Sequence, residues 1–195
     1  MKSRTFLWFL PVALLAVLAV WRCAAAGEVQ TGEEKKTEEE VLVGAVTRDG
    51  IEKAVPRWVE AEVAAQPDAE TARALATVEP GAEVTVFLGT WCGDSRREVP
   101  RLWKALDEAG AAVPFAVRYV GVDRAKKEPA DAVAANGVRY LPTFIVRRGG
   151  GEVGRIVESA PDGIEKDLLA LLTGKARGVL TLRDDLAAGE PKPHS

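Results

Sequence analysis

The chain has 195 residues and a formal net charge of −3, with two cysteines and one histidine. Two cysteines and one histidine are too few for a cysteine/histidine zinc site, and the single histidine disfavours a Ser/His/Asp triad in this chain. The histidine, His194, lies in a polar C-terminal stretch, which argues against a catalytic histidine–cysteine pair. We expect no metal and no cofactor.

Residues 1–26 have the pattern of an export signal. Two basic residues, Lys2 and Arg4, precede an apolar stretch over residues 6–21, and alanines at 24–26 offer a small-residue cleavage site. The apolar stretch has 16 residues, fewer than the roughly 20 that a membrane span needs. The pattern favours a cleaved signal peptide over an uncleaved N-terminal anchor, and it predicts an exported protein of the periplasm or cell envelope.

Cleavage would change both the charge and the cysteine content of the chain. Three basic residues and no acidic one would be lost, which lowers the formal charge from −3 to −6 and argues against nucleic-acid binding. Cys92 would remain as a lone thiol, and structural cysteines of secreted proteins usually come in pairs, so a chemical role is favoured. A lipoprotein anchor at Cys23 is a minor alternative, because Arg22 stands where such a signal needs a small residue.

A charge-dense linker is predicted over residues 27–40, which have almost no apolar surface to bury. One folded domain is expected over residues 41–173, followed by a tail over 174–195. Its first part is predicted as a strand at 41–46, a turn at 47–50, and helices at 56–65 and 69–78, the second capped by Asp68. Trp58 is assigned to the core, with a role in covering the active site as the alternative.

Residues 83–102 begin as a short apolar strand and continue as an amphipathic helix, with Cys92 between the two. At a helix start, unpaired backbone N–H groups and the positive end of the helix dipole converge, and both favour the nucleophilic thiolate. A reactive cysteine is therefore predicted. The alternative is an inert buried thiol that behaves as a small apolar residue.

The remaining elements alternate as in an α/β protein, with crossover helices for the parallel strands. They are a strand at 113–122, a helix at 128–135, strands at 143–148 and 152–158 joined by a glycine turn, and a helix at 164–172.

Residues 91–95, Trp-Cys-Gly-Asp-Ser, resemble the thioredoxin active-site pattern Trp-Cys-Gly-x-Cys, with serine in place of the second cysteine. Pro100 matches the proline that kinks the active-site helix of that family. Residues 136–144 (NGVRYLPTF) are similar to its cis-proline segment. The two motifs occur in the family's order, and the resemblance covers residues 84–172.

The resemblance implies a thioredoxin-like three-layer α/β sandwich with an extended N-terminal helical block and a cis Leu141–Pro142 bond. It implies that Cys92 is the catalytic nucleophile and that Ser95 assists it. Serine cannot form the resolving disulfide, but its hydroxyl can donate a hydrogen bond to the Cys92 thiolate. Substrate contacts are implied for five residues, Trp91, Gly93, Asp94, Leu141 and Pro142.

Two departures weaken the case for thioredoxin-style reduction. The family often has a buried acid six residues before the active cysteine, and this chain has Val86 there. Tyr119 falls near the place of the lysine that accompanies that acid. A peroxidase is also disfavoured, because Gly89 stands where the peroxiredoxin motif has its threonine, although Thr90 follows it.

Three functions remain open. The favoured one is monothiol thiol–disulfide exchange of the oxidoreductase or isomerase type, with protein or small-molecule thiols and disulfides as partners. The others are a non-catalytic peptide- or protein-binding module and a structural protein of the envelope. We expect no nucleic-acid partner and membrane contact only through an uncleaved N-terminal segment, and the oligomeric state is open.

Overall fold

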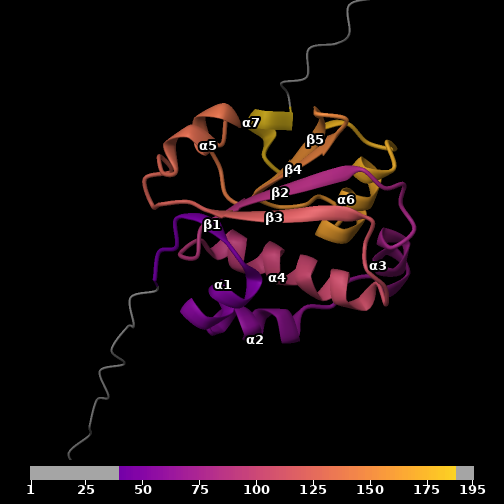
Figure 1. Ribbon diagram of the computed structural model, residues 1–195, viewed down its shortest axis with the longest axis horizontal. Helices are drawn as coiled ribbons and strands as arrows, with labels where there is room; N and C mark the ends of the chain where they lie inside the picture. Colours follow the sequence, from indigo (N-terminus) through magenta and orange to yellow (C-terminus); the bar gives the residue numbers. More distant parts are fainter. Residues whose placement is uncertain (1–39, 188–195) are drawn as a thin grey trace, which may run out of the picture. The chain divides into compact units, whose positions relative to one another are not determined.

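The computed structural model describes residues 40–187, which form a six-stranded mixed sheet in the order β1-β3-β2-β4-β5-β6 (Figure 1). The strands are β1 (Gly44–Val46), β2 (Ala82–Leu88), β3 (Phe115–Gly121), β4 (Thr143–Arg148), β5 (Gly151–Val157) and β6 (Gly178–Leu180). The pairs β2–β3 and β5–β6 are parallel, and the other three neighbouring pairs are antiparallel. The predicted signal segment and nearly all of the predicted linker lie outside the described residues.

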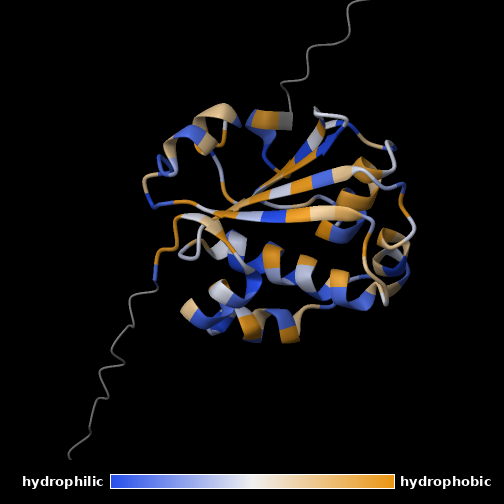
Figure 2. Cartoon of the chain, viewed as in Figure 1, coloured by the Kyte–Doolittle hydropathy of each residue, from blue (hydrophilic) through white to orange (hydrophobic). Residues whose placement is uncertain are grey.

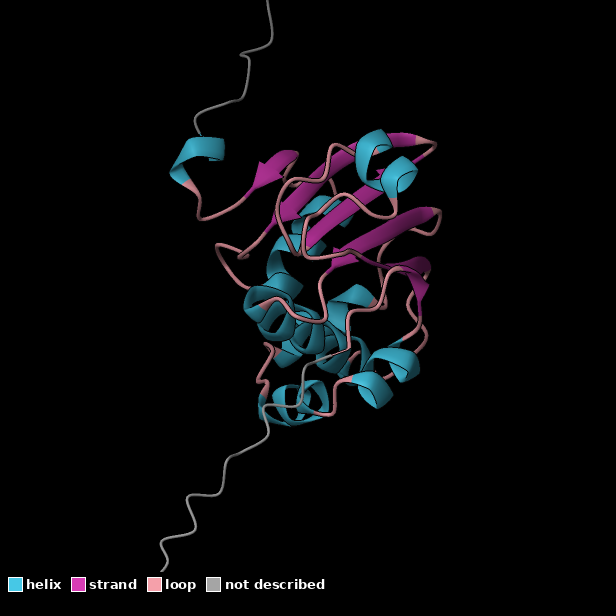
Figure 3. Ribbon diagram, turned by 90° about the vertical axis from the view of Figure 1, so that its left-hand side faces the viewer, coloured by secondary structure: helices cyan, strands magenta, loops and turns pink. Residues whose placement is uncertain are grey.

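Helices cover both faces of the sheet, which confirms the predicted three-layer sandwich. They are α1 (Arg48–Ala54), α2 (Arg57–Ala64), α3 (Ala69–Leu75), α4 (Gly93–Glu108), α5 (Ala130–Ala135), α6 (Ile164–Leu172) and α7 (Asp184–Ala187). The short helices α5 and α7 lie on one face, while the longer α4 and α6 lie on the other (Figures 1 and 3). In residues 40–187 no helix combines the length and apolarity that crossing a bilayer would need.

The sequence of β2 explains how the sheet holds two cores. Side chains alternate between the two faces of a strand, and hydropathy alternates along β2 in Figure 2. Val84 and Val86 enter the larger core beneath α4, whereas Phe87 enters the smaller core, which also contains Val133 of α5. Both faces of the carboxyl end of β2 are therefore buried, and the residues that follow are anchored on a rigid strand.

The N-terminal helical block lies on the same face as α4, and its helices α2 and α3 both pack against α4. Trp58 of α2 is fully buried, with its ring centroid 5.6 Å from that of Trp103 of α4. The assignment of Trp58 to the core is confirmed. The turn predicted at 47–50 is wrong, because the Thr47 hydroxyl accepts a hydrogen bond from the Gly50 N–H at 3.1 Å and caps α1.

The stretch predicted as a tail from residue 174 onward contributes β6 and α7. Gly154 of β5 and Gly178 of β6 are paired, and their backbones approach so closely that a Cβ on Gly154 would lie 2.5 Å from the Gly178 carbonyl oxygen. Two glycines facing each other thus allow the extra strand to join the sheet. The sheet therefore extends beyond residue 173, to Leu180.

Gly154→Ala is expected to lower the free energy of unfolding by about 1–3 kcal/mol, the usual range for overpacking. The added methyl group would meet the β6 backbone and Leu171 Cδ2, the latter at 2.7 Å. Gly151→Ala is the matched control, since its nearest neighbour would lie 3.8 Å away. Urea denaturation of both variants makes the comparison, and equal stability would contradict this close packing of β6.

Candidate functional site

Cys92 lies at the junction of β2 and α4, as the sequence predicts. It is the N-cap residue of α4, with extended backbone angles (φ −88°, ψ 127°), and its carbonyl accepts the Arg96 N–H at 3.1 Å. The thiol is free and half-buried. The Cys92 side chain accepts no hydrogen bond from the N–H groups of the first turn, and a half-buried residue at a helix N-terminus is partly open to an incoming substrate.

The turn that presents Cys92 is tight. The Cys92 N–H donates to the Gly89 carbonyl at 2.9 Å, and a Cβ on Gly89 would lie 2.8 Å from the Trp91 ring. Trp91 is held by a hydrogen bond of 3.0 Å from its Nε1 to the Val122 carbonyl, and the Arg124 guanidinium lies 5.6 Å from its ring centroid. The indole therefore forms a fixed wall beside the sulfur.

The cis-proline loop lies against Cys92. The Leu141–Pro142 bond is cis, as predicted, and Cys92 Sγ donates a hydrogen bond to the Leu141 carbonyl at 3.4 Å. Two further hydrogen bonds hold the loop, from the Glu158 N–H to the Pro142 carbonyl at 2.8 Å and from Thr143 Oγ1 to the Tyr140 carbonyl at 2.7 Å. The fold thus brings together two motifs that are fifty residues apart in the sequence.

Ser95 is fully buried beneath the turn, one helical turn after Cys92. Its Oγ accepts the Gly89 N–H at 3.2 Å, so the hydroxyl supports the turn that carries the cysteine. A bond from Ser95 to the Cys92 sulfur, expected from the sequence, is not among the hydrogen bonds of residues 40–187. Because the oxygen acts as acceptor toward Gly89, its proton is available to another acceptor.

Asp94 and Gly93 form the front of the site. Gly93 is exposed, and Asp94 pairs with Arg97 at 2.8 Å. Arg97 also donates to Ser159 Oγ at 2.5 Å and to Glu98 at 3.0 Å. Burial raises the pKa of Glu98 against the opposing effect of Arg97. Arg97, which sequence reasoning missed as a structural link, thereby ties the first turn of α4 to the loop between β5 and α6.

The position six residues before the cysteine has no acid. Val86 is fully buried and pairs in register with Tyr119 on β3. The Tyr119 ring meets Trp103 edge-on, with centroids 6.0 Å apart, and burial raises the pKa of Tyr119 to about 12. Tyr119 is therefore neutral at physiological pH, and this pair offers no carboxylate for proton transfer.

The Thr90 hydroxyl binds the backbone of the segment before β1. Its Oγ1 donates to the Glu40 carbonyl at 2.6 Å and accepts the Leu42 N–H at 3.3 Å. The hydroxyl fixes the segment that leads into β1, which weakens the peroxidase alternative further. Within residues 40–187, no three His, Cys, Asp or Glu side chains are grouped as metal ligands.

Comparison with known proteins gives two sequence matches. Thioredoxin H2-1 of rice (Oryza sativa subsp. japonica) is 34% identical over 95 residues, which is 49% of this chain and 64% of that protein. Thioredoxin-like protein R548 of Acanthamoeba polyphaga mimivirus is 28% identical over 96 residues, which is 49% of this chain and 66% of that protein. The chain has a thioredoxin-like fold.

Each match spans just under two thirds of the relative's own length. Among solved structures, the thioredoxin of Fasciola hepatica matches with 27% sequence identity and a TM-score of 0.35, over 54% of this chain and 90% of that chain. No model of a known protein family matches the sequence.

Proposed function

We propose that the protein is an exported, monothiol thiol–disulfide exchange enzyme of the oxidoreductase or isomerase type that acts through Cys92. The observation that carries the proposal is the half-buried Cys92 sulfur at the start of α4, 3.4 Å from the carbonyl of the residue before Pro142. Cys92 is partly exposed at the N-terminus of α4, and Trp91 and the cis-proline loop lie beside it.

With one protein thiol, the exchange reaction needs a mixed disulfide and an external thiol. The Cys92 thiolate attacks one sulfur of a substrate disulfide, a Cys92–substrate disulfide forms, and the other substrate sulfur leaves as a thiolate. A second, external thiol then attacks the mixed disulfide and restores Cys92. Ser95 cannot perform this second attack, so the external thiol is required for turnover. The loop carbonyls beside Cys92, including that of Leu141, are suited to orient an extended peptide.

Trapping of the mixed disulfide tests the proposal. The protein is incubated with bis(2-hydroxyethyl) disulfide, quenched in acid and analysed by mass spectrometry. We expect an adduct of one half of the reagent on Cys92, and its removal by added mercaptoethanol. Failure to form the adduct, or an adduct that thiol does not remove, would leave the peptide-binding module as the better function.

The export component rests on residues 1–26 alone. Expression of the full chain in a bacterial host, followed by mass analysis of the envelope fraction, is expected to give a protein that starts near residue 27. A full-length product in the cytoplasmic fraction would contradict export.

Ser95→Cys is expected to convert the site into a dithiol. Ser95 lies three residues after Cys92 at the start of α4 and directly beneath the turn, so mild oxidation should give an intramolecular disulfide. The product should reduce or oxidise substrates without an external thiol, in contrast to the wild type. The measurement is the thiol titre before and after oxidation. Two free thiols after oxidation would show that the cleft geometry differs from a thioredoxin dithiol.

A further inference from the structure

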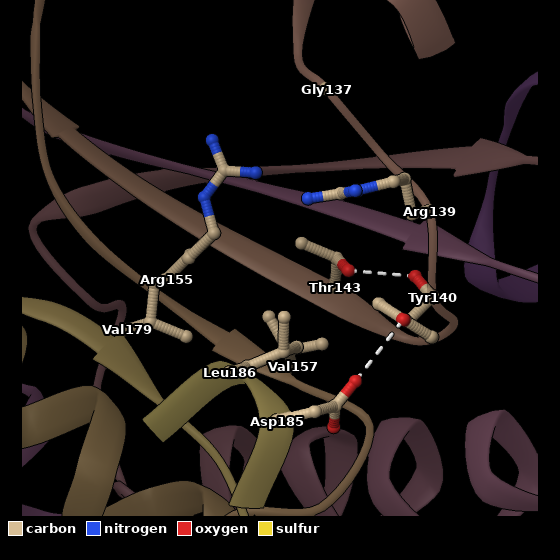
Figure 4. A pocket seen from close by; sticks show the side chains of 9 residues that line it. All are labelled: Gly137, Arg139, Tyr140, Thr143, Arg155, Val157, Val179, Asp185 and Leu186. Atoms are coloured by element: carbon tan, nitrogen blue, oxygen red, sulfur yellow. Dashed lines mark hydrogen bonds between the residues drawn. The ribbon is translucent and has the colours of Figure 1, made fainter. Parts of the chain in front are cut away.

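A pocket of about 380 Å³ lies beside the cis-proline loop, on the face of the sheet that carries α5 and α7 (Figure 4). Its walls come from the loop before β4, from β4 and β5, and from the C-terminal elements β6 and α7. Such a volume is in the range of small-molecule sites. Because β6 and α7 close one side, the pocket depends on the part of the chain that follows residue 173.

Two guanidinium groups face each other across this pocket. Arg139 and Arg155 point toward one another above Thr143 (Figure 4). Arg155 is neutralised by Glu152, with bonds of 2.6 and 2.7 Å. Arg139 is exposed and pairs with no carboxylate among residues 40–187. Arg155 also donates to the Asn136 carbonyl at 2.9 Å. Arg139 is therefore the guanidinium at this pocket whose charge no carboxylate of residues 40–187 offsets, and an anion beside it would gain an ion pair.

The other charged groups around the pocket belong to one ion-pair network. Asp185 of α7 binds Arg183 through both carboxylate oxygens at 3.0 Å, which holds the pKa of Asp185 below its usual value. Arg183 also binds Glu158 at 3.0 Å, and its guanidinium lies 4.0 Å from the Tyr140 ring centroid. Asp185 is thus already paired, and the positive charge of Arg139 remains uncompensated in the pocket.

Another part of the lining is apolar. Val157, Val179 and Leu186 line one side of the pocket, and Val179 is 39% exposed. A ligand for this site should carry one negative charge near Arg139 and a short hydrocarbon part against these side chains. A phosphate dianion matches neither the single uncompensated charge nor the apolar wall.

We propose that this pocket is a binding site for a small organic monocarboxylate, with the carboxylate between Arg139 and Arg155 and the apolar chain against Val157, Val179 and Leu186. Guanidinium groups bind carboxylates through charge-assisted hydrogen bonds in a defined geometry. The site does not use Cys92, so it stands independently of the exchange reaction.

Titration of ¹⁵N-labelled protein tests the site, with hexanoate as the probe, hexanamide as its uncharged match and inorganic phosphate as a bare anion. Hexanoate is expected to give saturable shifts at residues 137–143 and 178–186, whereas hexanamide and phosphate bind at least tenfold more weakly. No saturable shift with hexanoate would overturn the proposal. Equal binding of hexanamide would overturn the role of charge, and equal binding of phosphate would overturn the role of the apolar wall.

Two arginine variants test whether Arg139 binds the carboxylate of hexanoate. Arg139→Ala is expected to weaken hexanoate binding about tenfold or more, because a charge-assisted bond is lost. Arg118→Ala, which removes an exposed arginine of β3 outside the pocket lining, should bind as the wild type does. The same spectra show whether each variant is folded. Wild-type affinity in folded Arg139→Ala would overturn the assignment.

Discussion

Cys92→Ser is expected to abolish disulfide exchange and to move the melting temperature by only a few degrees. Serine cannot form a disulfide, so the first step of the reaction is lost. The hydroxyl can still donate to the Leu141 carbonyl, as the thiol does at 3.4 Å, and the half-buried position leaves it access to water. No buried polar group is left without a partner, so the usual cost of about 1–3 kcal/mol does not arise.

Exchange assays and thermal denaturation of the same preparations check this expectation. Cys92→Ala serves as the matched control, because it removes the sulfur without adding a polar atom. If Cys92 is catalytic, both variants are inactive and both remain close to the wild type in stability. Retained activity together with a large fall in melting temperature would mean that the cysteine serves only in packing, as in a non-catalytic module.

The parts of the fold that local sequence determines could be predicted. The bounds predicted for β4 and α6 match the structure, because each element is flanked by strong local signals. The glycines at 149–151 allow the turn after β4, and Pro161-Asp162-Gly163 precedes α6. Asp68 caps α3 as predicted, since its carboxylate accepts the Thr71 N–H at 2.8 Å. In each case the information lies within a few residues of the element.

The elements that tertiary contacts determine could not be predicted. The strand β6 has three residues, too few for a recognisable alternation, and its place depends on the close approach of Gly178 to Gly154. The helix α1 has one fully buried side chain, Ile51, and so lacks an apolar stripe. The antiparallel pairing of β1 with β3 could not be predicted either. A strand of three residues contains too little sequence to indicate the direction of its neighbour.

The candidate site divides in the same way. The resemblance to two family motifs was sufficient to predict that Cys92 and Leu141 lie close together, because each residue belongs to one of those motifs. The hydrogen bond from Gly89 to Ser95 and the attachment of Thr90 to the segment before β1 depend on side-chain orientation. The assistance of Ser95 to Cys92 stays a prediction, and the structure adds that the Ser95 hydroxyl supports the turn.

The largest effect on stability is expected at the ion pair between Arg101 and Glu165. The Glu165 side chain is fully buried and accepts Arg101 Nε at 2.9 Å, Arg101 Nη2 at 2.6 Å and the Asp68 N–H at 3.0 Å. It thereby joins α4, α6 and the start of α3. Arg101→Met keeps the length of the side chain but leaves a buried carboxylate without its cation, which should cost about 3–5 kcal/mol at neutral pH.

The pH dependence separates this electrostatic loss from a packing defect. Burial raises the pKa of Glu165, but the bonds from Arg101 and the Asp68 N–H outweigh it, and the net pKa is lower than the ordinary 4.5. In the wild type its stabilisation is complete above that value and is lost as the pH falls through the folded-state pKa. Without Arg101 burial prevails and the pKa rises, so protonation restores stability and the deficit of the variant should shrink between pH 7 and pH 5.

Urea denaturation at both pH values measures the deficit, and Glu165→Gln supplies the control. In the double variant, Glu165→Gln removes the buried carboxylate that Arg101→Met leaves without a cation. The double variant should therefore be more stable at pH 7 than Arg101→Met alone, and its deficit relative to the wild type should no longer shrink between pH 7 and pH 5. A deficit in Arg101→Met that is equal at the two pH values and unchanged by Glu165→Gln would mean that Arg101 stabilises the fold through the packing of its guanidinium group rather than through its charge.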